Sequence, residues 1–182
     1  MSHRTDANVG SRDEVGILLT SAQIIERVRE LGSAITHDYE GRSLVMVCVL
    51  KGSFVFAADL ARAITLPLRV EFLGVRSYGQ GTKSSGVVQI THDLEHPIEG
   101  EDVLLVEDIV DTGKTLHDFL PGLRHQQPAS LKIAALLHKP AATIFPLTID
   151  YLAFSIPDKF VVGYGLDYDG LGRNLKEIYQ LV

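Results

Sequence analysis

The segment that most constrains the fold is an uninterrupted apolar run at 103–106, which leads directly into acidic residues and a Thr-Gly-Lys-Thr turn at 112–115. An apolar run without alternation is typical of a strand buried on both faces, as in a parallel sheet. Ligands of open α/β sheets bind beyond the carboxyl ends of such strands. The sequence therefore predicts an α/β fold with a ligand site where this strand ends, near residue 108.

The end of this strand carries an unusual concentration of negative charge, with Glu107, Asp108 and Asp111 close together. Carboxylates crowded at the end of a buried strand cost free energy unless a cation or hydroxyl donors lie beside them. The following turn offers backbone N–H groups, two hydroxyls and a helix start, which together bind anions. A metal ion, or a sugar that carries hydroxyls and phosphates, would satisfy both halves of the loop.

Two other interpretations of the same run are possible. An ATP-binding P-loop requires a glycine at the position occupied here by Asp108, so that pattern fails. A plain strand–turn–helix with a solvated acidic turn is common, and it would explain a single Asp-Thr-Gly. It does not explain the crowding of acids, so a functional site is the better interpretation.

Strand and helix patterns alternate along the rest of the chain. A capping box formed by Thr20 and Gln23 starts a helix whose apolar residues recur to Ile35, although Gly32 weakens it and could end it early. Further helices are expected at 54–64 and 115–125, strands at 44–50, 68–75, 87–94, 103–108, 131–137, 149–156 and 160–164, and either element at 174–182. The strand–helix–strand unit at 44–75 favours parallel pairing with a right-handed crossover.

Length and composition are those of one domain in a reducing compartment. The 182 residues contain no linker and no apolar stretch of membrane-spanning length. The polar segment at 1–13 is expected to be a flexible tail rather than a signal peptide. The single cysteine, Cys48, excludes an intrachain disulfide and a cysteine metal cluster, so a cytoplasmic location is expected. The net charge of −6 argues against nucleic-acid binding.

Four stretches together resemble the type I phosphoribosyltransferases, and more narrowly the hypoxanthine-guanine phosphoribosyltransferases. They are Leu104–Leu116, Val49–Ser53, a Gly- and Ser-rich loop (Ser77–Gly79 with Gly81–Gly86), and Pro157–Tyr168, and the resemblance extends over about residues 12 to 180. It implies a mostly parallel central sheet flanked by helices within one domain at 14–182. It also implies a small hood subdomain over the base site, built from the N- and C-terminal segments, and a mobile lid at 76–87.

The resemblance also implies a reaction and its ligands. Enzymes of this family join a purine base to 5-phosphoribosyl pyrophosphate (PRPP) and release pyrophosphate, through an oxocarbenium-like transition state. Mg²⁺ is the expected cofactor, and PRPP and a 6-oxopurine are the expected substrates. A homodimer or homotetramer is expected, with no nucleic-acid or membrane partner.

Site residues follow from matching the family's motifs to this sequence. The residues expected to bind the 5′-phosphate are Asp111, Thr112, Gly113, Lys114 and Thr115, and those expected to bind the ribose are Glu107 and Asp108. The pyrophosphate is expected to bind to Lys51, Gly52 and Arg173, and the lid is expected to carry Ser77 and Tyr78. The residues expected to bind the purine are Lys139, Phe160, Val161 and Asp167, and those expected to bind the metal are Glu107, Asp108 and Asp167. Asp111 would accept the N7 proton. In the family an aromatic residue usually precedes the arginine that matches Arg173, whereas this sequence has Leu171-Gly172 there. The peptide bond between the residues that match Leu50 and Lys51 is often cis in the family.

Alternatives remain for the base, which could be xanthine, adenine or a pyrimidine, and for catalysis itself. Lys139 can donate to a 6-oxo group, whereas the 6-amino group of adenine is itself a donor, but xanthine is only weakly excluded. A non-catalytic regulator that kept the fold and binds PRPP, nucleotide or RNA is the second alternative, and the intact Asp111, Lys139 and Asp167 argue against it. The seven histidines are expected to be structural, since Pro97 beside His92 and His96 opposes a helical metal pair.

Overall fold

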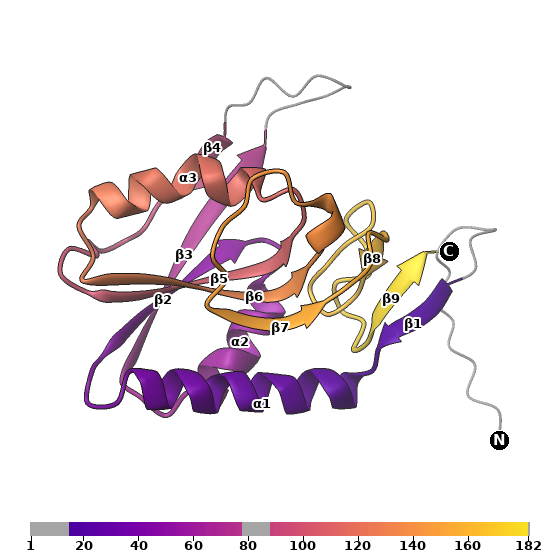
Figure 1. Ribbon diagram of the computed structural model, residues 1–182, viewed down its shortest axis with the longest axis horizontal. Coiled ribbons are helices and arrows are strands. Elements are labelled where there is room, and N and C mark those ends of the chain that lie inside the picture. Colours follow the sequence, from indigo (N-terminus) through magenta and orange to yellow (C-terminus); the bar gives the residue numbers. More distant parts are fainter. Residues whose placement is uncertain (1–14, 78–87, 182) are drawn as a thin grey trace.

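The structure is a computed structural model that describes residues 15–77 and 88–181. The predicted N-terminal tail and most of the predicted lid, including Tyr78, lie outside the described residues. The central sheet has six strands in the order β4-β3-β2-β5-β6-β7, and a smaller sheet has the order β1-β9-β8 (Figure 1). The strands of the central sheet are β2 (Leu44–Leu50), β3 (Leu68–Ser77), β4 (Val88–His92), β5 (Asp102–Val110), β6 (Ser130–His138) and β7 (Tyr151–Ser155).

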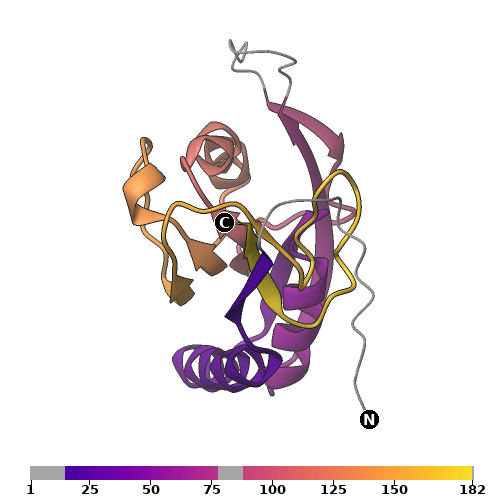
Figure 2. The same cartoon turned by 90° about the vertical axis from the view of Figure 1, so that its right-hand side faces the viewer.

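Helices cover both faces of this sheet, as expected for an α/β fold. All neighbouring strands pair in parallel except β4, which runs antiparallel to β3 at one edge. The helices α1 (Ser21–Asp38) and α2 (Phe54–Ala63) lie on one face, and α3 (Lys114–His125) lies on the other (Figure 2). The short 3-10 helix η1 (Pro140–Ala142) follows β6. The strand–helix–strand unit at 44–75 is parallel, as predicted.

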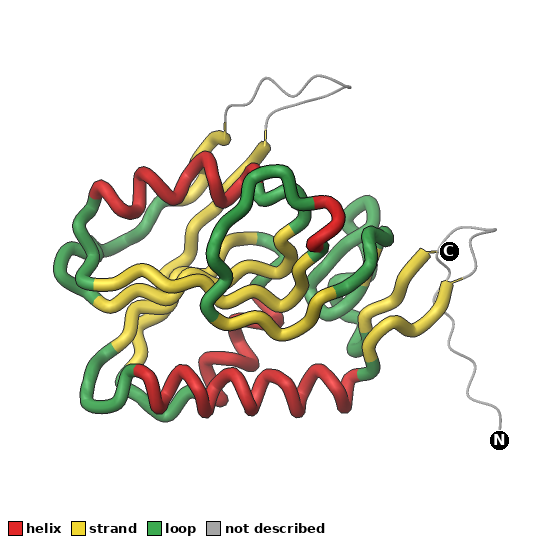
Figure 3. The backbone as a smooth tube through the Cα atoms, in the orientation of Figure 1, coloured by secondary structure: helices red, strands yellow, loops and turns green. Residues whose placement is uncertain are grey.

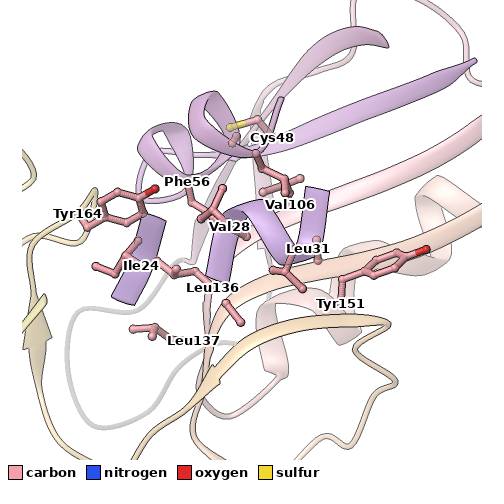
Figure 4. Packing of buried hydrophobic residues seen from close by; sticks show 14 of the residues in the cluster. Ile24, Val28, Leu31, Cys48, Phe56, Val106, Leu136, Leu137, Tyr151 and Tyr164 are labelled. Atoms are coloured by element: carbon pink, nitrogen blue, oxygen red, sulfur yellow. The ribbon is translucent and has the colours of Figure 1, made fainter. Parts of the chain in front are cut away.

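The core has two layers, because the central strands bury both of their faces. In β2, Met46 and Cys48 face the layer under α1 and α2, whereas Val45 and Val47 face the layer under α3. The first layer joins residues of α1, α2, β5, β6 and β7 (Figure 4). Cys48 is thus a buried core residue that forms no disulfide, as expected.

The small sheet is built from both ends of the described chain. It contains β1 (Val15–Leu19), β8 (Val161–Val162) and β9 (Ile178–Leu181), with β9 antiparallel to both neighbours. The ambiguous segment at 174–182 therefore contains a strand. The strand expected at 160–164 is shorter than predicted, because Gly163 has φ of 112° and turns the chain out of the sheet. No helix in the described ranges is both long and apolar enough to cross a membrane.

Gly32 does not end the first helix, because it serves the packing of α1 on α2. The capping box is present, with the Gln23 N–H donating to Thr20 Oγ1 at 3.3 Å. The helix then continues to Asp38, and a Cβ placed on Gly32 would lie 2.5 Å from the Cβ of Ala63. The glycine lets the two helices approach each other at this crossing, where any side chain would separate them.

Gly32→Ala is expected to lower the free energy of unfolding by about 2 kcal/mol, even though alanine favours helix by about 1 kcal/mol. The matched control is Gly122→Ala in α3, where an added Cβ meets nothing within 4 Å. That substitution should raise stability by up to about 1 kcal/mol. Urea denaturation of both variants measures the difference, and stabilisation by Gly32→Ala would contradict this account of the helix crossing.

Candidate active site

The acidic residues lie further inside the sheet than the sequence predicts. Strand β5 was expected to end at residue 108, but it extends to Val110, where Ile109 pairs with Leu137 of β6 and Val110 with His138. Glu107 and Asp108 therefore lie before the end of the strand rather than at it, and only Asp111 follows the strand. A cavity of about 210 Å³ opens here, lined by Glu107–Gly113, Thr115 and Leu116. Figure 3 shows the loop that joins β5 to α3 at this end of the sheet.

Glu107 is buried and Asp108 is half-buried, and their carboxyl groups have few hydrogen-bond partners. Glu107 is 8% exposed, and its Oε2 has no hydrogen-bond partner among the described residues. Burial raises its pKa well above the usual value, and the neighbouring Asp108 raises the pKa further. The Asp108 carboxylate accepts one bond from the Ile109 N–H at 2.9 Å, yet burial still raises the pKa of Asp108 to about 6. Both carboxylates are therefore ready to receive hydroxyl donors or a cation.

The loop at 111–115 forms an anion cradle at the start of α3. Gly113 caps the helix with φ of 78°, and a Cβ at this position would overlap the Phe145 carbonyl. The N–H groups of Ile144 and Phe145 donate to Thr112 O at 3.0 and 2.9 Å, which fixes the loop from behind. Thr112, Gly113 and Thr115 line the cavity at the start of α3, where the helix dipole favours an anion.

The Lys114 side chain turns away from this cradle. Its Nζ donates to Asp118 Oδ2 at 2.8 Å and lies 5.6 Å from the centre of the Phe145 ring. Only the main chain of Lys114 belongs to the loop, and its N–H donates to Thr112 Oγ1 at 3.3 Å. The Lys114 ammonium group is therefore bound to Asp118 rather than directed at an anion in the cradle.

The Lys51–Gly52 loop packs directly on Asp108. It follows β2, the Leu50–Lys51 peptide is cis, and Lys51 is exposed. A Cβ on Gly52 would overlap Oδ2 of Asp108, so only glycine allows this approach. The predicted pyrophosphate residues, Lys51 and Gly52, therefore lie beside the predicted ribose and metal residues.

A third segment reaches the same place from the C-terminal part of the chain. Arg173 pairs with Asp167 at 2.6 Å, and its Nη1 donates to Gly165 O at 2.7 Å. The Arg173 charge lowers the pKa of Asp108 and the Asp167 charge raises it, although burial is the largest influence on that pKa. The structure thus brings Asp167 and Arg173 close to Asp108, as the motif match implied.

The residues around Asp108 have the chemistry of a magnesium site shared with a phosphate ligand. In the described ranges, no group of three ligating side chains forms a metal cage by itself. Mg²⁺ typically binds through one or two carboxylates together with water and substrate phosphate oxygens. The unpartnered Glu107 oxygen and the carboxylates of Asp108 and Asp167 fit that arrangement.

Lys139 joins the acidic loop to the segment at 157–168. Its Nζ lies 3.1 Å from Asp111 Oδ2 and 3.4 Å from Asp158 Oδ1, and the residue is 7% exposed. Its N–H donates to Val110 O at 2.9 Å, which fixes it beside the end of β5. The sequence prediction missed Asp158, whose only signal was its place within the Pro157–Tyr168 stretch.

Two further predicted purine residues, Phe160 and Val161, differ in exposure, and only Phe160 is at the surface. Phe160 is 48% exposed, and its ring meets Tyr168 edge-on with centroids 5.5 Å apart. The Leu181 N–H donates to Phe160 O, so Val161 is a non-hydrogen-bonded partner of Gln180. The main-chain groups of Val161 therefore point away from β9 and can meet a ligand. Ser77 ends β3, its side chain is outside the described residues, and Tyr78 is wholly outside them.

Comparison with known proteins agrees with this geometry. The family described as "Phosphoribosyl transferase domain" matches residues 14–169. The chain belongs to the phosphoribosyltransferase family.

The hypoxanthine-guanine phosphoribosyltransferase of Mycobacterium tuberculosis (strain CDC 1551 / Oshkosh) is 48% identical over 172 residues, which cover 91% of this chain and 85% of the relative. The protein of that name from Streptococcus thermophilus is 42% identical, with coverage of 90% and 91%. A crystal structure of a hypoxanthine phosphoribosyltransferase from Staphylococcus aureus superimposes with a TM-score of 0.88 at 45% identity, and covers 92% of this chain and 91% of its own. The similarity thus extends over nearly the whole family fold.

A second, larger cavity lies outside the family's ligand loop. It measures about 450 Å³ and lies between α3 and the segment at 146–150. Its lining includes His117, Arg124 and Asp150, but the Asp150 carboxylate already accepts the Ile133 N–H at 2.8 Å. It has neither a carboxylate pair nor a helix start, so the smaller cavity at the end of β5 is the candidate active site.

In the ligand-free, metal-free protein, Asp108→Asn is expected to raise the free energy of unfolding by about 2 kcal/mol at pH 8. The native pKa of Asp108 is raised from 3.8 to about 6, so the native state binds a proton more tightly than the unfolded state. The stabilisation of the native state by this proton is complete below pH 3.8 and is lost as the pH rises through 6. The gain from asparagine should therefore vanish near pH 4. Chemical denaturation across this range measures it, and a gain that does not depend on pH would contradict the assignment.

Proposed function

We propose that this phosphoribosyltransferase transfers the 5-phosphoribosyl group from PRPP to N9 of hypoxanthine and guanine, which gives IMP or GMP and pyrophosphate. The observation that carries the proposal is the position of Lys139, which lies 3.1 Å from Asp111 beside the anion cradle. The names of the relatives support the same base class. The reaction would take place in the cytoplasm, in a homodimer or homotetramer.

The acidic loop would bind the sugar phosphate. Thr112, Gly113 and Thr115 surround the 5′-phosphate, which gains from the helix dipole of α3. Glu107 and Asp108 accept hydrogen bonds from the ribose 2′- and 3′-hydroxyls, which would compensate their burial. The cradle and the acids are consecutive in the chain, so they hold the phosphate and the diol at a fixed separation.

The pyrophosphate would lie between the Lys51–Gly52 loop and Arg173. The loop offers main-chain N–H groups, and Arg173 offers a guanidinium group that pairs with Asp167 in the absence of ligand. Mg²⁺, held by Glu107, Asp108 and Asp167 together with substrate oxygens, would supply positive charge to the leaving group. Arg173 adds charge-assisted hydrogen bonds to the same oxygens.

The purine would enter between Lys139 and Phe160. The Lys139 ammonium donates to the 6-oxo group, Phe160 stacks on the ring, and the main chain of Val161 contacts its edge. Asp167 contributes a main-chain contact near the 2-position. Asp111 accepts the proton of N7 as N9 attacks the anomeric carbon, and Lys139 keeps its carboxylate in position.

A panel of bases separates this function from its two alternatives. The protein is incubated with PRPP, Mg²⁺ and one base at a time, and pyrophosphate release is measured. Turnover with hypoxanthine and guanine supports the proposal, and a clear preference for xanthine indicates a xanthine phosphoribosyltransferase. Tight PRPP binding without turnover on any base would indicate a non-catalytic regulator.

Asp111→Asn is expected to lower kcat by about 100-fold, because it removes the proton acceptor but keeps the shape of the loop. The dissociation constant of PRPP should change less than about threefold, since the cradle is built from backbone groups and hydroxyls. Single-turnover kinetics and calorimetry measure the two quantities. The matched control is Asp93→Asn, an exposed carboxylate on another loop, which should leave both unchanged. Equal losses in kcat and in PRPP affinity would remove Asp111 from the role of base.

A further inference from the structure

Tyr164 has an unusual position in the segment that carries Asp167 and Arg173. It is buried, with 6% exposure, yet its φ is 49°, in the left-handed region that L side chains rarely adopt. Its neighbours Gly163 and Gly165 have φ of 112° and 101°. A tyrosine persists in such a backbone only where the surrounding structure holds it, which makes its side-chain contacts informative.

The Tyr164 side chain connects two parts of the proposed pyrophosphate site. Its ring belongs to the core layer that contains Ile24 and Phe56 (Figure 4), and its hydroxyl donates to Asp59 Oδ2 at 2.6 Å. Asp59 lies on α2, the helix that begins directly after the Lys51–Gly52 loop. One hydrogen bond therefore ties the C-terminal segment to the helix that follows this loop.

The main chain beside Tyr164 makes the same connection at shorter range. A Cβ on Gly165 would overlap the Gly52 carbonyl, so these two backbones are in direct contact. The Gly165 N–H donates to Arg173 O at 3.0 Å, and Gly165 O accepts from the Arg173 guanidinium at 2.7 Å. The orientation of the Arg173 guanidinium thus depends on the carbonyl of Gly165, the residue that follows Tyr164.

We propose that Tyr164 is a positioning residue for the pyrophosphate half of the site, acting through its hydrogen bond to Asp59. The bond holds the turn at 163–165 against the Lys51–Gly52 loop, and this turn orients the Arg173 side chain. This inference rests on the proposed function. It assigns Tyr164 to the leaving group and gives it no part in recognition of the purine, which other residues perform.

Tyr164→Phe tests the proposal, because it removes the hydroxyl and keeps the ring in the core. It is expected to raise the KM for PRPP, and the dissociation constant for pyrophosphate with Mg²⁺, by about tenfold, the size of a lost hydrogen bond to a charged group. The KM for hypoxanthine and kcat should stay within about twofold. Asp59→Ala should reproduce these values, and the double variant should be no worse than either single variant.

Two controls separate the hydrogen bond from general effects. Tyr179→Phe removes a tyrosine hydroxyl bonded to a carboxylate, Glu177, in the nearby β9 and should change nothing. Arg62→Ala removes the other side-chain partner of Asp59 and should also leave both constants unchanged. Melting temperatures of all variants show whether a loss of folding accompanies any change.

Two outcomes would overturn the proposal. One is an equal rise in the KM of both substrates for Tyr164→Phe, and the other is additivity of Tyr164→Phe and Asp59→Ala. If the unaltered protein turns over neither hypoxanthine nor guanine, the proposed function fails. Calorimetry with pyrophosphate and Mg²⁺ still decides the role of Tyr164 in that case, because this measurement needs no turnover.

Discussion

The position of two carboxyl groups near the end of β5, with Glu107 buried and Asp108 beneath Gly52, is the constraint on which the rest of the site depends. The two carboxyl groups belong to consecutive residues near the end of a strand buried on both faces, and Oε2 of Glu107 has no partner among the described residues. Burial raises the pKa of both groups, so ionising them costs free energy in the absence of ligand. Hydroxyl donors and a cation recover that free energy on binding. The fold therefore keeps a polar pair where an apolar pair would be more stable, and this pair contributes to ligand affinity.

Glycines bring the other parts of the site to this pair. Gly52 lies on Asp108, Gly165 lies on Gly52, and Gly113 lies on the Phe145 carbonyl, each where a Cβ would overlap its neighbour. Distant segments of the chain thus meet at glycines, and the contacts of Gly165 with Gly52 and of Gly113 with Phe145 join backbone to backbone. Such contacts have no side-chain freedom, so they can hold phosphate-binding N–H groups with little loss of entropy on binding.

The sequence predicted the elements better than it predicted their limits. Apolar periodicity is local, so it located α1 and the buried strands. The extension of β5 depends on pairing with β6, and the passage of α1 through Gly32 depends on Ala63, so no local pattern contains either. The same holds in the site. The phosphate cradle followed from consecutive residues, whereas Lys139, Asp167 and Arg173 were placed only by resemblance, because the segment at 157–173 is irregular and has no period. Asp158 was missed because only the folded chain brings it to Lys139.

The contact between Lys139 and Asp111 suggests how base choice and proton transfer are linked in the proposed reaction. In a free 6-oxopurine that carries its imidazole proton on N7, the 6-oxo oxygen is an acceptor and the neighbouring N7–H is a donor, and both lie on one edge of the base. An ammonium and a carboxylate that lie 3.1 Å apart can meet these two neighbouring atoms at the same time. In adenine, the 6-amino group would direct a donor at the ammonium, and the ring would have to move to relieve this. That movement would also take N7 away from Asp111. A base with the wrong group at position 6 would thus lose both its binding contact and its proton acceptor, so one ion pair would act on both affinity and rate.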